Sequence, residues 1–223
     1  MSRSRRDIPK NEYISRKLSK ILRHKGLEEG YEFSRDGFTP LDPIMVKLFK
    51  EGPKVTFEMI EKIVENNDKQ RFTLVERPED YNPYTGEGSG KQIWFIRANQ
   101  GHSFKNPDGT PYLDGSLIFK EITEPFSSCI HGTNVKAIEV IMREGLSRMD
   151  RDYIHLALGM PDEVVDGEKV ISGMRRKAKA VIRVDVPKAM DAGIKFYKSS
   201  NGVILTQGFG GVIPPEFLSA EMI

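Results

Sequence analysis

The chain has 223 residues, of which 38% are hydrophobic and 30% charged, with a net charge of +2 and a single cysteine. This composition excludes a disordered profile and supplies apolar side chains for one large domain or two small ones. One cysteine, Cys129, excludes an internal disulfide and a cysteine-rich zinc site, and it indicates a reducing compartment.

The N-terminal segment is polar and basic, and no apolar stretch approaches the ~20 residues that span a bilayer. We therefore expect a soluble intracellular protein, cytoplasmic, nuclear or both, with no membrane partner. Residues 1–100 carry 19 Lys and Arg against 16 Asp and Glu. This small basic excess permits a nucleic-acid partner, although an ordinary charged surface accounts for it equally well.

In the first half of the chain, apolar spacing predicts three helices followed by two strands. Thr56 is a candidate N-cap of the third helix. A segment rich in Pro, Gly and Asn, residues 78–90, separates the two strands and predicts a mobile hairpin loop. Three helices followed by a β-hairpin is the order of a winged helix, a common nucleic-acid module. The helices are expected at 13–24, 42–49 and 57–64, and the strands at 72–75 and 93–96.

The second half opens with residues 101–115, whose Gly, Asn, Asp and Pro content indicates a linker. One helix is expected at 134–143, capped by Asn134 and stopped by Gly145. Its core-facing side chains are predicted to be Val135, Ile138 and Ile141. Strands are expected at 128–131, 153–157, 180–186, 194–197 and 203–206.

Arg23 and His24 are adjacent at the end of the first predicted helix. Cations there could simply compensate the helix dipole. They could also clamp a phosphate, because a guanidinium binds phosphate with a planar fork and an imidazole can add a donor or pass a proton. Arg71, with Lys69 just before it, begins a strand; a solvated corner is the plain alternative to phosphate binding.

His131, Gly132 and Thr133 end a strand and open a helix, a junction at which a ligand can approach backbone N–H groups. A lone strand histidine is more often structural, but His155 lies on a second predicted strand. Together the two histidines resemble the core of the ADP-ribosyltransferases, many of which carry a Glu on a later strand; the corresponding residues here, 201–205, offer no carboxylate. That absence suits a phosphate as nucleophile, because a phosphate is already mostly dianionic at neutral pH and needs cations to hold it and no carboxylate base.

Four short motifs, in this order, resemble the NAD-dependent RNA 2′-phosphotransferases from about Ser15 to about Pro214. The resemblance implies an α+β fold: a winged-helix RNA-binding lobe at 1–100 and an ADP-ribosyltransferase-like mixed β lobe, binding NAD, at 101–223. The motifs are Ile21-Leu22-Arg23-His24, Asn67-Asp68-Lys69-Gln70-Arg71, Ile130-His131-Gly132-Thr133-Asn134 and Asp150-Arg151-Asp152-Tyr153-Ile154-His155-Leu156.

The resemblance also implies the site. A catalytic tetrad is expected, with Arg151 preferred to the nearby Arg148 because its spacing to His155 matches the family: Arg23, His24, Arg71 and Arg151. Binding of NAD is assigned to His131, Gly132, Thr133, His155, Leu156, Ser172, Gly173, Arg175 and Val203. Binding of RNA phosphate is assigned to Lys69, His102 and Ser103, and no metal is expected.

The implied reaction removes an internal 2′-phosphate from RNA, such as a tRNA splice junction, in two steps. The phosphate attacks C1″ of NAD and releases nicotinamide, leaving the RNA ADP-ribosylated on its phosphate. The ribose O2″ then attacks phosphorus, giving 2′-OH RNA and ADP-ribose 1″,2″-cyclic phosphate. We expect a monomer. Two alternatives are NAD-dependent ADP-ribosylation of terminal nucleic-acid phosphates and a non-catalytic winged-helix RNA-binding protein.

Overall fold

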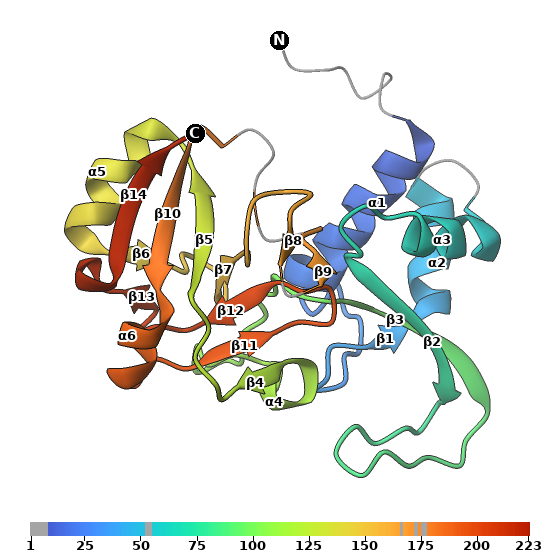
Figure 1. The fold of residues 1–223 in the computed structure, drawn as a ribbon. Coiled ribbons are helices and arrows are strands. Elements are labelled where there is room, and N and C mark those ends of the chain that lie inside the picture. The colour runs from blue at the N-terminus through green and yellow to red at the C-terminus, as the bar shows by residue number, and fades with distance from the viewer. Residues whose placement is uncertain (1–8, 52–54, 166, 172–173, 175–177) are drawn as a thin grey trace. The chain divides into compact units, whose positions relative to one another are not determined.

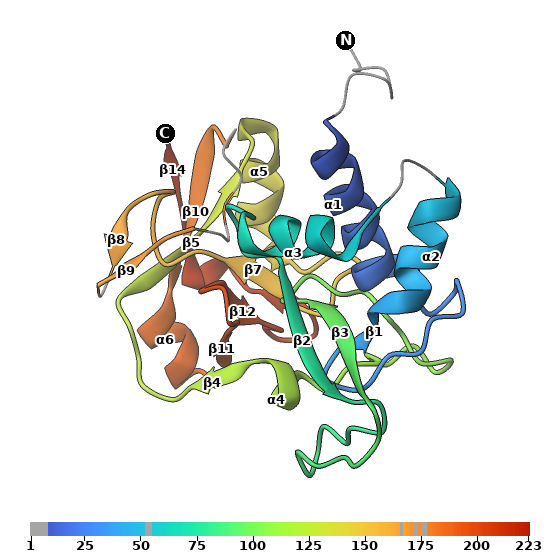
Figure 2. The same cartoon turned by 90° about the vertical axis from the view of Figure 1, so that its right-hand side faces the viewer.

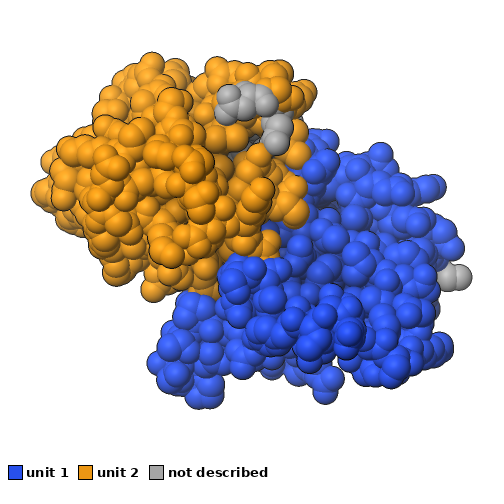
Figure 3. All heavy atoms as spheres, turned by 60° about the horizontal axis from the view of Figure 1, so that its bottom comes forward, with its two compact units in different colours: residues 1–117 blue, residues 118–223 orange. Residues whose placement is uncertain are grey.

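The computed structural model describes residues 9–51, 55–165, 167–171, 174 and 178–223. The chain forms two compact units, Met1–Leu117 and Ile118–Ile223 (Figure 3). Both contain helices and β-sheet, so the α+β class is confirmed. The boundary between the units follows Leu117, whereas the sequence analysis placed it at residue 100. No helix in the described part of the chain is long and apolar enough to cross a membrane.

In the first unit, the helices lie close to the predicted positions and the strands are longer than predicted. The helices are α1 (Lys10–Lys20), which continues into the π-helical turn η2 (Ile21–Lys25), α2 (Leu41–Glu51) and α3 (Phe57–Glu65). The strands are β1 (Thr39–Pro40), β2 (Phe72–Pro78) and β3 (Gln92–Ala98), in the antiparallel order β1-β3-β2.

The three helices pack together beside the long β2–β3 hairpin (Figure 2). Their inward stripes recur at helical spacing and form the core of this unit. Fully buried members are Ile14, Leu18 and Leu22 of the first helix, Ile44 of the second and Ile60 of the third. Thr56 holds the N-cap position of α3, but its side chain makes no capping bond to the helix backbone; it bonds the Glu58 side chain instead.

The loop between β2 and β3, predicted as mobile, has a hydrogen-bonded framework of its own. The Asp80 carboxylate accepts hydrogen bonds from the backbone N–H groups of Ser89 and Gly90, at 2.9 and 2.6 Å. These bonds hold the pKa of Asp80 below its usual value, although the little burial it has acts in the opposite direction. Asn82 and Glu87 form an isolated bridge across the loop.

The second unit contains two main antiparallel sheets (Figure 1). One has the order β14-β10-β5, from strands β5 (Ser128–Thr133), β10 (Ala180–Asp185) and β14 (Leu218–Met222). The other has the order β4-β11-β12-β7, from strands β4 (Lys120–Ile122), β7 (Ile154–Leu156), β11 (Phe196–Lys198) and β12 (Ile204–Thr206).

Short elements complete the two units. They are the helix α4 (Gly115–Ile118), the strand pair β6 (Leu146–Ser147) and β13 (Val212–Ile213), the pair β8 (Val164–Val165) and β9 (Glu168–Lys169), the helix α6 (Val186–Asp191) and the 3₁₀ turn η3 (Pro215–Phe217). A buried apolar cluster that includes Cys129, Leu156 and Phe196 joins the strands to α6. Burial raises the pKa of the Cys129 thiol far above its usual value, so this cysteine is structural.

The helix predicted at 134–143 is α5 (Val135–Glu144), which packs against β10 and β14. Its N-cap is confirmed, because the Asn134 side chain accepts a hydrogen bond from the Ala137 N–H at 3.1 Å. The predicted burial is wrong for Val135, whereas Ile141 packs against the buried core of this unit. Val135 is 50% exposed, and Ile138 and Ile141 are only partly buried. A helix covering a sheet from the outside needs to bury only a narrow stripe, and Val135 in the first turn lies beyond it.

Candidate functional site

Arg23 and His24 lie on the π-helical turn η2, which follows α1 without a break. The Gly26 N–H donates to the Ile21 carbonyl at 2.9 Å, across five residues instead of four. Such turns are rare and often occur at functional sites. Gly26 permits this one, because a Cβ at that position would lie 2.5 Å from the Phe33 ring and 2.7 Å from the Ile21 carbonyl oxygen.

Residues 99–103, which we call the strap, run from the end of β3 back to this turn. The Ser103 N–H donates to the Arg23 carbonyl at 2.9 Å, and the Ser103 hydroxyl lies 2.9 Å from His24 Nδ1. Gly101 adopts a φ of +88°, and a Cβ built on it would lie 3.6 Å from the Arg23 side chain. The strap thus belongs to the first unit and brings Ser103 together with Arg23 and His24.

His102, also on the strap, is 4% exposed. Burial first, and then the charges of Arg23, Arg97 and His24, lower its pKa to about 3. Its side chain hydrogen-bonds to the Ala98 backbone. His102 is therefore neutral at physiological pH and adds no charge to a phosphate site; the contact with RNA phosphate expected for it stays a prediction.

Arg71 is positioned by an asparagine four residues earlier. Asn67 Oδ1 accepts a hydrogen bond from the Arg71 guanidinium at 3.1 Å and from the N–H groups of Lys69 and Arg71 at 3.2 and 3.3 Å. Burial lowers the pKa of Arg71, and the charge of Asp68 partly offsets this shift. Arg71 still carries its charge, because an arginine stays protonated at any working pH. The Arg71 carbonyl accepts from the Asn99 N–H at 2.8 Å, which ties Arg71 to the strap.

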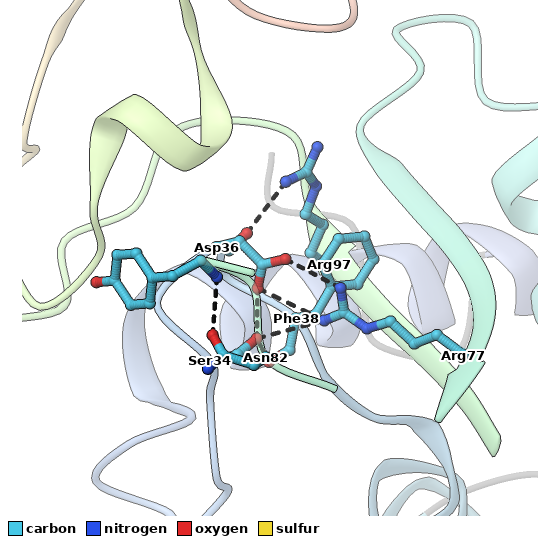
Figure 4. A network of polar contacts seen from close by, with 7 residues as sticks. Ser34, Asp36, Phe38, Arg77, Asn82 and Arg97 are labelled. Atoms are coloured by element: carbon cyan, nitrogen blue, oxygen red, sulfur yellow. Dashed lines mark hydrogen bonds and ion pairs between the residues drawn. The ribbon is translucent and has the colours of Figure 1, made fainter. Parts of the chain in front are cut away.

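Arg97 was not singled out from the sequence, where it is one polar residue at the end of an apolar strand. It is close enough to His102 to lower that residue's pKa, and its guanidinium donates to the Asp36 carbonyl at 3.1 Å. Figure 4 shows Arg97 and Arg77 converging on Asp36. The Asp36 carboxylate pairs with Arg77 at 3.0 Å, and the Phe38 ring contacts both guanidinium groups, at 4.1 and 4.7 Å.

In the second unit, His131 on β5 and His155 on β7 are brought together. His131 Nδ1 lies 2.9 Å from the His155 carbonyl oxygen, beside the isolated bridge between Ile130 and Ala157. A carbonyl only accepts, so Nδ1 carries the proton and Nε2 of the neutral ring is an acceptor.

Other residues assigned to NAD lie deeper. Leu156 and Val203 expose none of their surface, and Thr133 and His155 each expose 8%. Gly132 is covered by Met174, since a Cβ on Gly132 would lie 2.4 Å from Met174 Cγ. Ser172, Gly173 and Arg175 fall outside the described residues.

Arg148 and Arg151 have different surroundings. The Arg148 guanidinium donates to the Arg151 carbonyl, and its chain lies against Gly211, so Arg148 braces the loop. The Arg151 side chain is exposed.

Of the proposed tetrad, Arg23, His24 and Arg71 belong to the first unit and Arg151 to the second. Within the described part of the chain, no group of three His, Cys, Asp or Glu side chains could hold a metal.

Comparison with known proteins identifies the class. The family described as RNA 2′-phosphotransferase, Tpt1 / KptA family, matches residues 9–208. The chain therefore belongs to this family, as the sequence motifs indicated.

Individual relatives carry names of the same kind. The chain is 36% identical to tRNA 2′-phosphotransferase 1 of Danio rerio, over 92% of this chain and 83% of that protein. It is 34% identical to tRNA 2′-phosphotransferase 1 of Homo sapiens, over 96% and 77%. It is 29% identical to tRNA 2′-phosphotransferase of Saccharomyces cerevisiae, over 100% and 86%.

Proposed function

We propose that this protein removes the internal 2′-phosphate of an RNA, with a spliced tRNA as substrate, and transfers it to NAD. The observation that carries the proposal is the family match over residues 9–208, which spans every member of the tetrad. The first unit would be a winged-helix RNA-binding lobe, and the second an ADP-ribosyltransferase-like lobe that binds NAD.

The phosphate would be held by the cations of the first unit. Arg23 and His24 lie on one π-helical turn, and the Asn67 amide orients Arg71 without neutralising it. Guanidinium groups bind phosphate oxygens in a bidentate way and stay charged. The arrangement supports a phosphate as nucleophile, because a dianion needs cationic donors and no base.

NAD, as consumed co-substrate, would supply C1″ as electrophile and nicotinamide as leaving group. His131 fits one edge of that molecule, because its ring is fixed by the His155 carbonyl and keeps Nε2 as an acceptor for a ribose hydroxyl. Attack of a 2′-phosphate oxygen would release nicotinamide and leave the RNA ADP-ribosylated on its phosphate.

In the second step, the ribose O2″ would attack phosphorus while the RNA 2′-oxygen leaves with a proton. The products would be 2′-OH RNA and ADP-ribose 1″,2″-cyclic phosphate. Arginine side chains, including Arg151, would stabilise the charge that develops on the phosphoryl oxygens. Pre-organised donors of this kind lower such barriers by several kcal/mol, on the order of 3 for one donor.

The test is to incubate the full chain with NAD and a short RNA bearing one internal 2′-phosphate, and to read the products by mass. We expect loss of the phosphate together with ADP-ribose cyclic phosphate and free nicotinamide. Persistent ADP-ribosylated RNA would support single-step ADP-ribosylation of phosphates instead. RNA that binds but stays unchanged in the presence of NAD would indicate a non-catalytic RNA-binding protein.

A further inference from the structure

The Ser103 hydroxyl stands between two groups of the π-helical turn. It lies 2.9 Å from His24 Nδ1 and donates to the Arg23 carbonyl at 3.4 Å. The same carbonyl accepts the Ser103 N–H at 2.9 Å. The backbone of Ser103 is thus bonded to the turn, and its hydroxyl oxygen faces His24 Nδ1.

Ser103 has a single hydroxyl proton to share between the Arg23 carbonyl and His24. A serine hydroxyl has one proton to donate and lone pairs to accept with, whereas a carbonyl only accepts. When the Ser103 proton points to the Arg23 carbonyl, the hydroxyl oxygen can take a hydrogen bond only from a protonated His24 Nδ1. The same arrangement serves the imidazolium form, in which Nδ1 must donate, so no hydroxyl rotation is needed when His24 gains a proton.

We propose that Ser103 is a positioning residue for His24. Its hydroxyl oxygen accepts a hydrogen bond from His24 Nδ1 and so keeps the imidazole proton on that nitrogen. Ser103 then acts through His24, because its one hydroxyl proton goes to the Arg23 carbonyl and its oxygen accepts from Nδ1. The inference rests on the proposed function for its catalytic meaning, but the tautomer of His24 can be observed without any reaction.

A proton on Nδ1 decides what His24 can donate from Nε2. With Nδ1 protonated, neutral His24 has a lone pair on Nε2 and can donate from Nε2 only as imidazolium. Either a hydrogen bond to a phosphate oxygen or protonation of the departing 2′-oxygen through Nε2 therefore requires charged His24. The sequence leaves those two roles open, and both now depend on the same protonated state.

The rest of the strap supports a positioning role. Gly101 adopts a φ of +88°, which L side chains rarely take, and His102 is buried next to Arg23, Arg97 and His24. The strap therefore follows one defined path past the turn. This path places the Ser103 hydroxyl at His24 before any substrate is bound.

The experiment is two-bond ¹H–¹⁵N correlation NMR on the full chain labelled at histidine. The chain has only 4 histidines, and a His24→Gln variant assigns the His24 signals. We expect the Nδ1–H tautomer for neutral His24 in the wild type and in Ser103→Thr, which keeps a hydroxyl. Ser103→Ala should lose the tautomer preference, and its turnover should fall about tenfold, the usual scale for one hydrogen bond to a catalytic group, with NAD affinity unchanged.

Ser116→Ala is the matched control. It removes the hydroxyl of an exposed serine in the first unit, which donates to the Asp114 carboxylate. It should leave the His24 signals and turnover unchanged. An Nε2–H tautomer in the wild type, or an unaltered tautomer in Ser103→Ala, would overturn the proposal. A wild-type chain that shows the Nδ1–H tautomer but does not act on 2′-phosphorylated RNA would refute the proposed function and leave the positioning intact.

Discussion

His131 Nδ1 donates to the carbonyl oxygen of His155 over 2.9 Å, which joins the two histidines that the motifs singled out on separate strands. The bond involves the backbone of His155 and the side chain of His131. The backbone of β7 therefore sets the direction of the His131 ring, while the His155 side chain is itself buried.

The first prediction concerns this ring. His131→Ala should weaken NAD binding about tenfold, because it removes an oriented hydrogen-bond acceptor, and about 1.4 kcal/mol corresponds to a factor of ten. Titration calorimetry with NAD measures the change. Lys136→Ala, an exposed change on α5, is the control and should bind as the wild type does. Unchanged affinity in His131→Ala would remove His131 from the NAD site.

The second prediction concerns stability. Asp36→Asn should lower the free energy of unfolding by about 3 kcal/mol at pH 7, because it leaves the Arg77 charge enclosed without its carboxylate. The side chains of this pair are 11% and 9% exposed. Glu221→Gln removes the partner of Arg183 in a pair that is 49% and 62% exposed, and should change stability by less than about 1 kcal/mol. Urea unfolding compares the variants.

The pH dependence of the Asp36 contribution has a definite sign. Burial raises the pKa of Asp36, but the hydrogen bonds from Arg77 and Ser34 outweigh it, and the net pKa is lowered. A lowered folded-state pKa gives stability that is complete above the ordinary value of ~3.9 and is lost as the pH falls through the folded value. The difference between wild type and Asp36→Asn should therefore shrink from pH 5 towards pH 2; a constant difference would contradict this explanation.

The sequence predicted those features that follow from local periodicity. The apolar stripes of α1 and α3 and the Asn134 cap are local signals, and the structure has them. The π-helical turn was not predicted, because Ile21 and Leu22 continue the apolar stripe of a regular helix. The Phe33 ring lies where a Cβ on Gly26 would be, and only the folded chain brings these two residues together.

The candidate site follows the same division. The motifs identified Arg23, His24 and Arg71 by type and order, and the second motif contains Asn67, which orients Arg71, but the motifs did not show which groups orient the three cations. Ser103 lies 79 residues after His24, and Asp36 lies 61 residues before Arg97. Residues 101–115 were taken for a linker because Gly and Pro are common there, yet Ser103 and Asp114 hydrogen-bond to the backbones of Arg23 and Arg35 in the first unit.

The third prediction tests the orientation of Arg71. Asn67→Asp preserves the acceptor for the Arg71 guanidinium but adds a negative charge beside it. RNA affinity should fall about tenfold at low salt, since the carboxylate competes with RNA phosphate for Arg71, while the unfolding free energy should stay close to that of the wild type. The matched control is Asn66→Asp, the same change at an exposed neighbour. Equal losses in both variants would point to a general effect of charge.

The fourth prediction concerns the π-helical turn. Gly26→Ala should destabilise the first unit by about 1–3 kcal/mol, because its Cβ would overlap both the Phe33 ring and the Ile21 carbonyl oxygen. Activity should fall further than stability explains, since Arg23 and His24 would leave their positions. Lys20→Ala, an exposed change just before the turn, should alter neither. A fully active and stable Gly26→Ala would show that the turn is not required.

The last prediction separates the two proposed chemical steps. Arg151 is assigned to the charge on the phosphoryl oxygens, which grows when O2″ attacks phosphorus, and Arg148 already braces the Arg151 backbone and cannot replace it without releasing the loop. Arg151→Ala should therefore still release nicotinamide but accumulate ADP-ribosylated RNA, visible by mass within one turnover. Arg143→Ala, which removes an exposed arginine paired with Glu144, should give only final products. If Arg151→Ala releases no nicotinamide and forms no intermediate, Arg151 acts in the first step, and the assignment of the second step to it is wrong.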